Sequence, residues 1–238
     1  MEKNLLKSTF KDKTFLKNLF SLALPIAFQS LMVSLVGASD TIMLGSLDQY
    51  SMAAVSLATQ LQFIQNLTLS GIIAAFHVLG AQYSGKEDRK SVNMVLCMTL
   101  RICLVVSALT FLVCFSFPHM AMRIFTNVEE LVEIGVGYLK IASFSYLISG
   151  ISQCFLAQIK LGKNTKKVAT ISSIAVVLNI ALNAIFIFGL LGFPKMGVRG
   201  AALATVISRV VELVLSTIEC WKDKKIRPDL GKLFAFDR

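Results

Sequence analysis

Asp40 is the residue of this sequence whose position most clearly indicates chemistry. It directly follows an apolar run, residues 18–39, that contains no charged side chain. Placing a carboxylate at the centre of a membrane-spanning helix costs about 2.5–3.5 kcal/mol, so such residues usually face a water-filled cavity, pair with another group or bind an ion. At the end of a span the same residue can instead lie at the membrane interface. Asp40 is therefore a candidate cation site, with an interfacial position as the alternative.

Three further polar residues could contribute oxygen atoms to such a site. Asn179 and Asn183 lie four residues apart in an apolar run, a spacing that places both amides on one helix face. Thr205 lies in the next apolar run. Amide and hydroxyl oxygens can coordinate a hard cation such as Na⁺, and a carboxylate can carry a proton. The alternative for the two asparagines is hydrogen bonding between membrane helices.

Composition identifies the elements that must position these residues as membrane helices. Of the 238 residues, 55% are hydrophobic and 16% are charged, whereas an average soluble domain is about 25% charged. Each of six apolar runs can supply the roughly 20 residues that cross a bilayer. The runs are residues 18–39, 49–85, 102–122, 141–159, 168–194 and 200–220. We therefore predict an all-α membrane protein, a six-transmembrane-helix bundle, with a short amphipathic helix within residues 118–134.

The sixth run is the weakest, because Arg209 and Glu212 interrupt it. Their spacing of three places them on one helix face, where they can pair. We interpret them as a structural pair in preference to a second proton site.

The distribution of basic residues predicts the topology. Eighteen of the 24 Lys and Arg lie before residue 18, in residues 84–91 and 159–167, and after Cys220, whereas the alternate connections contain only Arg123, Lys195 and Arg199. By the positive-inside rule, six spans place all eighteen in the cytoplasm. We predict a multi-pass protein of the cell (plasma) membrane with both termini cytoplasmic. Its parts are a cytoplasmic segment (1–17), a six-helix transmembrane lobe (18–220) and a linker-like tail (221–238).

This topology brings the candidate site residues to one depth. At 1.5 Å per residue, Asp40, Asn183 and Thr205 each lie within roughly 6–12 Å of the outer boundary, so they could meet in the outward half of one bundle. The net charge of +10 fits an anionic bilayer surface better than nucleic acid, so we expect the lipid bilayer as partner and no nucleic acid.

An enzyme is not expected. The sequence has no nucleophile–base spacing, no Walker loop and no Gly-rich phosphate cradle. The five cysteines lie in or near apolar runs without a close pair, and we interpret them as packing or membrane-facing residues. We expect no cofactor.

Several segments together resemble the multidrug and toxic compound extrusion (MATE) family. The first span resembles it through LALPI (22–26) and DTIMLG (40–45). The first cytoplasmic loop resembles the family's loop at Gln82 and SGKEDRK (84–90). The fifth and sixth spans resemble the family's spans at LNIALN (178–183) and GVRGAALAT (197–205). The resemblance covers residues 15 to 220.

The resemblance implies a fold and a function. Members of that family have twelve helices in two six-helix lobes, and they export cationic or amphipathic drugs in exchange for Na⁺ or H⁺ by alternating access. It also implies a coupling site in the N-terminal lobe, at an Asp of the first span, two polar residues of the fifth and a Thr of the sixth. Those positions correspond to Asp40, Asn179, Asn183 and Thr205.

The length departs from the family, whose members have about twice as many residues. We therefore expect one lobe of a MATE-type transporter, active in multidrug efflux by cation (Na⁺ or H⁺) antiport together with a second lobe or as a homodimer. Two alternatives stay open: a non-transporting membrane fragment or assembly partner, and a related lipid-linked-sugar flippase.

Overall fold

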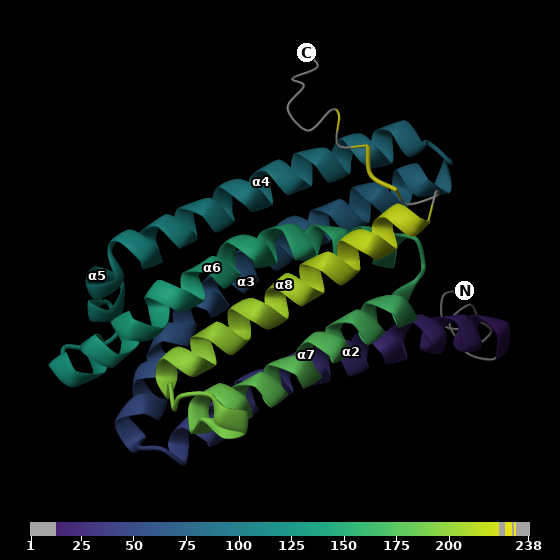
Figure 1. The fold of residues 1–238 in the computed structure, drawn as a ribbon. Coiled ribbons are helices and arrows are strands. Elements are labelled where there is room, and N and C mark those ends of the chain that lie inside the picture. The colour runs from purple at the N-terminus through teal and green to yellow at the C-terminus, as the bar shows by residue number, and fades with distance from the viewer. Residues whose placement is uncertain (1–12, 224–226, 230, 232–238) are drawn as a thin grey trace, which may run out of the picture.

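The computed structural model describes residues 13–223, 227–229 and 231. Within them every regular element is a helix (Figure 1). Most of the predicted cytoplasmic segment, 1–17, and most of the tail, 221–238, lie outside the described residues. Six of the helices are long and apolar enough to cross a membrane, which confirms the predicted all-α, six-helix membrane architecture.

The helices differ from the predicted spans mainly at their ends. They are α2 (Lys13–Gly45), α3 (Gln49–Gly85), α4 (Arg89–Ser116), α5 (Pro118–Arg123), α6 (Glu129–Leu161), α7 (Thr165–Phe188) and α8 (Val198–Lys222), with a 3-10 turn, η1, at Leu190–Gly192. The helices of the third and fourth spans begin 13 and 12 residues before the charge-free runs do, at positions 89 and 129. The difference arises because a charge-free run marks only the part of a helix that lies in hydrocarbon, whereas the helix itself continues through charged residues. The short helix predicted within residues 118–134 is α5.

Two aspartates outside the spans begin the helices that follow them. Asp48 precedes α3, and its carboxylate accepts hydrogen bonds from the backbone N–H and the hydroxyl of Ser51 at 2.6 and 2.7 Å. Asp88 makes the same pair of contacts with Ser91 ahead of α4, at 3.1 and 2.6 Å. These bonds favour the ionised carboxylate, so they lower the pKa of Asp48 and of Asp88 below the usual 3.8.

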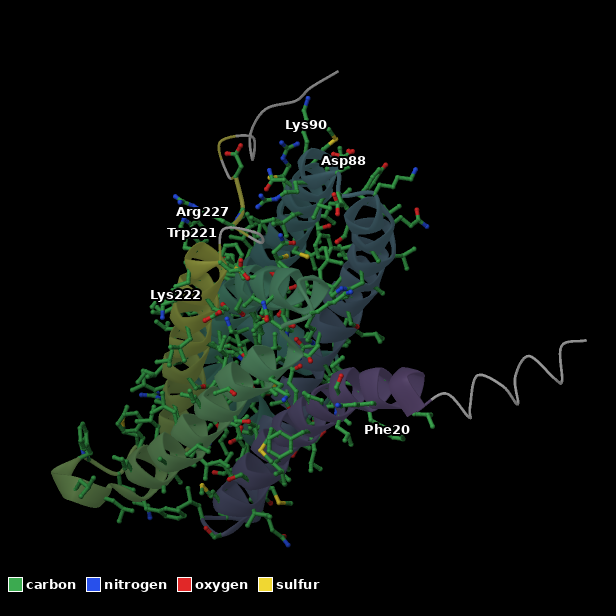
Figure 2. The ribbon with its side chains drawn as sticks, turned by 90° about the vertical axis from the view of Figure 1, so that its right-hand side faces the viewer. Phe20, Asp88, Lys90, Trp221, Lys222 and Arg227 are labelled. Atoms are coloured by element: carbon green, nitrogen blue, oxygen red, sulfur yellow. The ribbon has the colours of Figure 1, made fainter. Side chains whose placement is uncertain are left out.

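The connections gather at the two ends of the bundle. The α2–α3, α5–α6 and α7–α8 connections lie at one end, and the α3–α4 and α6–α7 connections lie at the other (Figure 1). α6 packs against α3, α4 and α8, while α7 packs against α2 and α8. Asp88 and Lys90 lie at the same end of the bundle as Trp221, in the last turn of α8, and Arg227, which comes after that helix (Figure 2). This arrangement agrees with the alternation expected of six spans.

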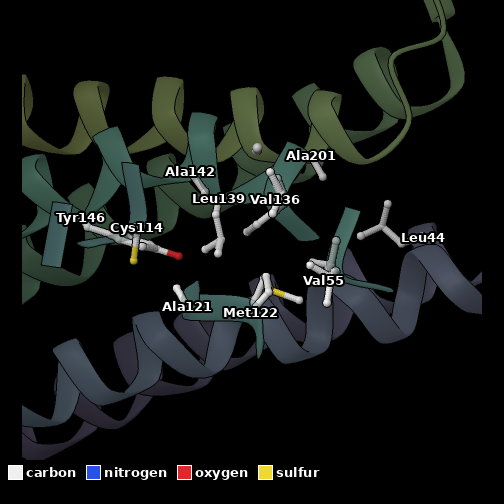
Figure 3. Close-up of a cluster of buried hydrophobic side chains, with 14 of the residues drawn as sticks. Leu44, Val55, Cys114, Ala121, Met122, Val136, Leu139, Ala142, Tyr146 and Ala201 are labelled. Carbon is white, nitrogen blue, oxygen red and sulfur yellow. The ribbon is translucent and has the colours of Figure 1, made fainter. Parts of the chain in front are cut away.

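Apolar packing fills the centre of the bundle. The largest cluster draws residues from α2, α3, α4, α5, α6, α7 and α8, with α6 supplying the greatest share (Figure 3). Tyr138, Leu139 and Tyr146 of α6 are fully buried. α5 contributes Met122, also fully buried, so this short helix caps the core rather than lying free on the surface.

Two glycines permit close helix contacts. A Cβ atom on Gly200 of α8 would lie 2.7 Å from the backbone oxygen of Phe186, and one on Gly150 of α6 would lie 2.1 Å from Oγ of Ser107. Small residues allow membrane helices to approach in this way. Gly200 thereby holds the start of α8 against the end of α7, next to the candidate site.

The outer surface carries many large apolar side chains. Leu24, Phe28, Leu31 and Ile42 of α2 are between 48% and 73% exposed, and Phe20 is exposed near the start of the same helix (Figure 2). The hydroxyl groups of Ser30, Ser34 and Thr41 bond to carbonyls one turn earlier on α2, as Thr41 does to Gly37 at 2.8 Å, which satisfies these donors within the helix. α2 is therefore suited to a hydrocarbon environment.

Candidate functional site

Asp40 lies near the end of α2 and is held by α7. The side-chain amide of Asn183 donates a hydrogen bond to Oδ1 of Asp40. The same amide nitrogen donates to Oδ1 of Asn179 at 3.1 Å. Asn183 is fully buried and Asp40 half-buried. α7 thus presents both amides on the face that meets α2, as the spacing of four residues predicted.

Asn179 extends this network to α8. Its amide nitrogen donates to the hydroxyl of Thr205 and to that of Ser208, each at 3.4 Å. Thr205 in turn donates to the carbonyl of Ala201 at 3.1 Å, which leaves its oxygen lone pairs directed at the network. The four residues that the sequence singled out therefore form one hydrogen-bonded chain across three helices. Ser208 was not predicted, although its spacing of three from Thr205 was a usable signal.

A cavity of about 380 Å³ lies between α2, α3, α7 and α8 and opens on this chain. Asp40, Asn179 and Thr205 line it, whereas Asn183 does not. Asn183 therefore supports Asp40 from behind instead of facing the cavity. Its Oδ1 atom is buried and has no hydrogen-bond partner among the described residues.

A polar face of α3 forms the opposite wall of the cavity, and sequence reasoning missed it. Its residues recur at intervals of three or four, so they share one side of the helix. Two large apolar side chains, Met52 and Phe63, accompany them. The polar members of this face are Ser56, Thr59, Gln62 and Asn66, and Gln60 also lines the cavity beside them. The cavity is consequently amphipathic, with polar groups distributed along apolar walls.

A second polar group lies farther along α8 in the same cavity. Arg209 donates from Nη1 to Oε2 of Glu212 at 2.7 Å, which confirms the predicted pair. Ser172 of α7 donates to Oε1 of Glu212 at 3.5 Å, and Gln29 of α2 donates to Ser172 at 3.0 Å. Arg209, Glu212 and Ser172 all line the cavity.

The charges of the ionisable residues that line the cavity do not sum to zero. Asp40 and Glu212 are acidic and Arg209 is basic, so with all three ionised the cavity has one uncompensated negative charge. The oxygen atoms in this network come from the carboxylate of Asp40, the amides of Asn179 and Asn183 and the hydroxyl of Thr205. That set suits a hard cation or a proton.

Other residues with chemical potential do not join this site. The described residues contain no group of three or more His, Cys, Asp or Glu that could hold a metal ion. All five cysteines are free and buried, in line with their interpretation as packing residues. His119 faces Glu133 at 3.8 Å near the start of α6, where both side chains are more than half exposed.

Comparison with known proteins places this geometry in a family. Residues 25–185 match the MatE family. The chain is 30% identical to an uncharacterized transporter, YisQ, of Bacillus subtilis, over 94% of this chain and 49% of the relative. It is also 30% identical to the probable multidrug resistance protein NorM of Thermotoga maritima, over 89% of this chain and 46% of the relative.

Solved structures agree on the fold. A MATE crystal structure in the bent conformation superposes with a TM-score of 0.82 at 23% identity, over 93% of this chain and 49% of that one. A Vibrio cholerae MATE transporter, VcmN, in the bent form superposes with a TM-score of 0.81 at 20% identity. The chain spans about half the length of the relatives it matches, with one six-helix bundle. By its sequence match over residues 25–185 and by this fold, the chain belongs to the MatE family of transporters.

Proposed function

We propose that this chain serves secondary-active multidrug efflux by antiport with Na⁺ or H⁺, with Asp40 as the residue that binds the coupling cation. One observation carries the proposal. Asp40 is a carboxylate within a membrane helix, it lines a cavity, and its hydrogen-bond partner is the amide of Asn183 rather than a fixed cation. An intramembrane carboxylate in such a position marks an ion or proton pathway.

The proposed substrates are small cationic or amphipathic molecules. The cavity volume of about 380 Å³ lies in the roughly 300–1,000 Å³ range of ligand pockets. With Asp40, Glu212 and Arg209 ionised, its one uncompensated negative charge favours a cation, and the apolar side chains of α3 that line it offer apolar contact beside the polar face. Several relatives are named as multidrug resistance proteins.

The proposal includes a second six-helix lobe. Transporters of this kind alternate access by rocking two repeats or bundles around a central site, and the chain spans about half of the relatives it matches. The second lobe is a further part of the same polypeptide, a separate chain or a second copy of this one.

Replacing Asp40 tests the proposal. Asp40→Asn keeps the size and hydrogen-bonding shape of the side chain but removes its charge. In cells that also express the second lobe of a relative, gradient-driven efflux of a cationic dye should be lost, while membrane insertion stays intact. The matched control is Glu130→Gln, which neutralises an exposed acid on the first turn of α6 away from the cavity, and it should transport as the unmodified protein does.

Undiminished gradient-driven efflux by Asp40→Asn would refute the coupling role. Loss of efflux in both variants would indicate a general defect of expression or folding. Efflux by neither the variants nor the unmodified pair of lobes would favour a non-transporting assembly partner.

A further inference from the structure

The buried ion pair of Arg209 and Glu212 calls for a reason beyond stability. Glu212 is 2% exposed, and its partner lies on the same helix three residues earlier. Removing two charges from water costs several kcal/mol per ion, so a buried salt bridge often contributes no net stability compared with apolar residues of similar volume. The pair also lines the cavity that Asp40 faces, which is where a mobile charge could act.

Along the axis of α8, Arg209 lies between the level of the Asp40 carboxylate and that of the Glu212 carboxylate. Thr205, Arg209 and Glu212 follow one another at intervals of four and three on one face of α8, so Arg209 is about 6 Å and Glu212 about 10 Å along the helix from Thr205. Long side chains on a helix lean toward its N-terminus, which directs Arg209 toward the level of Thr205 and its hydrogen-bonded neighbours. Arg209 and Asp40 line the same cavity.

The donors of Arg209 are largely unused. A guanidinium group has five N–H donors, and among the described residues Arg209 makes one hydrogen bond, to Glu212. Glu212 by contrast has additional support. Ser172 donates to its other oxygen, and the charge of Lys160 on α6 acts on it. Glu212 therefore keeps favourable partners if Arg209 turns away.

Building on the proposed coupling role of Asp40, we propose that Arg209 is an internal counter-ion that exchanges between Glu212 and Asp40. Arg209 pairs with Glu212 while Asp40 holds the coupling cation, and it moves to Asp40 when that cation leaves. The exchange spares Asp40 from standing as an isolated carboxylate during the return of the empty transporter. It also makes Arg209 a competitor of the coupling cation, and Glu212 the residue that draws this competitor away.

The competition predicts opposite effects from the two neutral variants. Arg209→Gln removes the competing charge, so Asp40 should bind its cation more tightly. Glu212→Gln releases Arg209 to Asp40, so binding should weaken. A single charge within 4–6 Å changes the affinity of a carboxylate for a proton by roughly ten- to a thousandfold, and we expect each shift to be at least about tenfold.

The affinity is measured directly on the purified full chain in lipid nanodiscs. One arm titrates ²²Na⁺ at fixed pH, and the other follows proton uptake in weak buffer without Na⁺, so the pair of arms also identifies the coupling ion. The groups that face this region from the packed helices are Asp40 on α2, Tyr138 and Lys160 on α6, and Arg209 and Glu212 on α8. Proton uptake that persists in Asp40→Asn comes from the other ionisable groups, so the difference from the unmodified chain measures binding at Asp40.

Two controls address folding. Arg199→Gln removes an exposed arginine from the first turn of α8, outside the cavity, and should leave the affinity unchanged. The double variant Arg209→Gln/Glu212→Gln leaves neither partner as a lone buried charge, and it should still bind the cation more tightly than the unmodified chain. Arg209→Lys keeps the charge and should stay close to the unmodified affinity.

The outcomes separate the two proposals. Loss of binding in Asp40→Asn, with opposite shifts in Arg209→Gln and Glu212→Gln, supports the exchange. Shifts in the same direction, or none, overturn the exchange while the coupling role of Asp40 stands. If either single variant does not fold, looser or unchanged binding by the double variant overturns the exchange. Undiminished binding by Asp40→Asn refutes the proposed function itself.

Discussion

Asn183 donates a hydrogen bond to Asp40 although 143 residues separate them in the sequence. The bond joins α7 to α2 and fixes the carboxylate at the cavity wall, while the amide that holds it stays out of the cavity. Asn183 is therefore a positioning residue, and Asp40 is the group exposed to a ligand.

Replacing Asn183 should impair transport without changing the cavity lining. Hydrogen bonds to charged groups contribute about 1.5–3 kcal/mol, so Asn183→Ala should reduce cation-coupled efflux by at least about tenfold, since 1.4 kcal/mol corresponds to a factor of ten. Dye efflux from cells that contain both lobes measures this. Asn127→Ala, in the exposed α5–α6 connection, is the control, and equal activity of the two variants would contradict the positioning role.

Gly200 should resist even the smallest substitution. A Cβ atom there meets the backbone oxygen and carbon of Phe186 at 2.7 and 2.8 Å, and backbone cannot move aside as a flexible side chain can. Gly200→Ala should destabilise the bundle by about 1–3 kcal/mol, as overpacking does. Thermal unfolding in detergent micelles measures the change. Gly71→Ala, where nothing lies within 4 Å, should be neutral or slightly stabilising because Ala is the better helix former.

The Asp48 cap should make the start of α3 sensitive to acid. Its pKa is lowered by the hydrogen bonds from Ser51, so its stabilising effect is present above the usual pKa of 3.8 and is lost as pH falls through the lowered value. Asp48→Ala should reduce protection of the first-turn amides at neutral pH by about 0.5 kcal/mol, the low end for N-caps, because the site is exposed. Hydrogen exchange compared with intrinsic rates measures this.

The pH dependence distinguishes a charged cap from a neutral one. Asp48→Asn keeps an N-capping side chain but cannot titrate, so its first-turn protection should stay constant below pH 4, where that of the unmodified chain declines. A parallel decline in both proteins would show that another group controls the start of α3.

The topology can be tested by chemical labelling. Single cysteines at Asp48, Glu130 and Lys195 should react with an impermeant maleimide added to intact cells, while cysteines at Lys86 and Lys163 should not. The positive-inside distribution sets this expectation, and the two sets lie at opposite ends of the bundle (Figure 1). The five native cysteines are buried and should give little background. Labelling of Lys86 or Lys163 from outside would overturn the orientation.

Expression of the chain by itself tests the need for a second lobe. In a drug-sensitive host the chain alone should confer little or no resistance, because alternating access needs two lobes around the site. Co-expression with the second lobe of a relative should restore resistance. Efflux by the purified chain as a monomer in liposomes would contradict the requirement, whereas efflux by a homodimer would show that two copies replace the two lobes.

The sequence by itself determined the membrane architecture and singled out Asp40 as the candidate site residue. Both depend on local energetics: about 20 apolar residues suffice to cross a bilayer, and a carboxylate drawn into the bilayer is costly unless it faces a cavity, a partner or an ion. The spacing of Asn179 and Asn183 was likewise enough to place them on one helix face. The starts of α4 and α6 did not follow from the charge-free runs, because charged residues end a hydrophobic run without ending a helix.

Only the tertiary structure decided which polar groups meet. Asn183 reaches Asp40 across α7 and α2, and Glu212 receives Ser172 from another helix, which no local pattern specifies. The polar face of α3 became part of the cavity because α3 lies opposite α7 and α8 there. Contacts between helices depend on how seven packed surfaces fit together, and that fit fixes which side of each helix faces lipid, core or cavity.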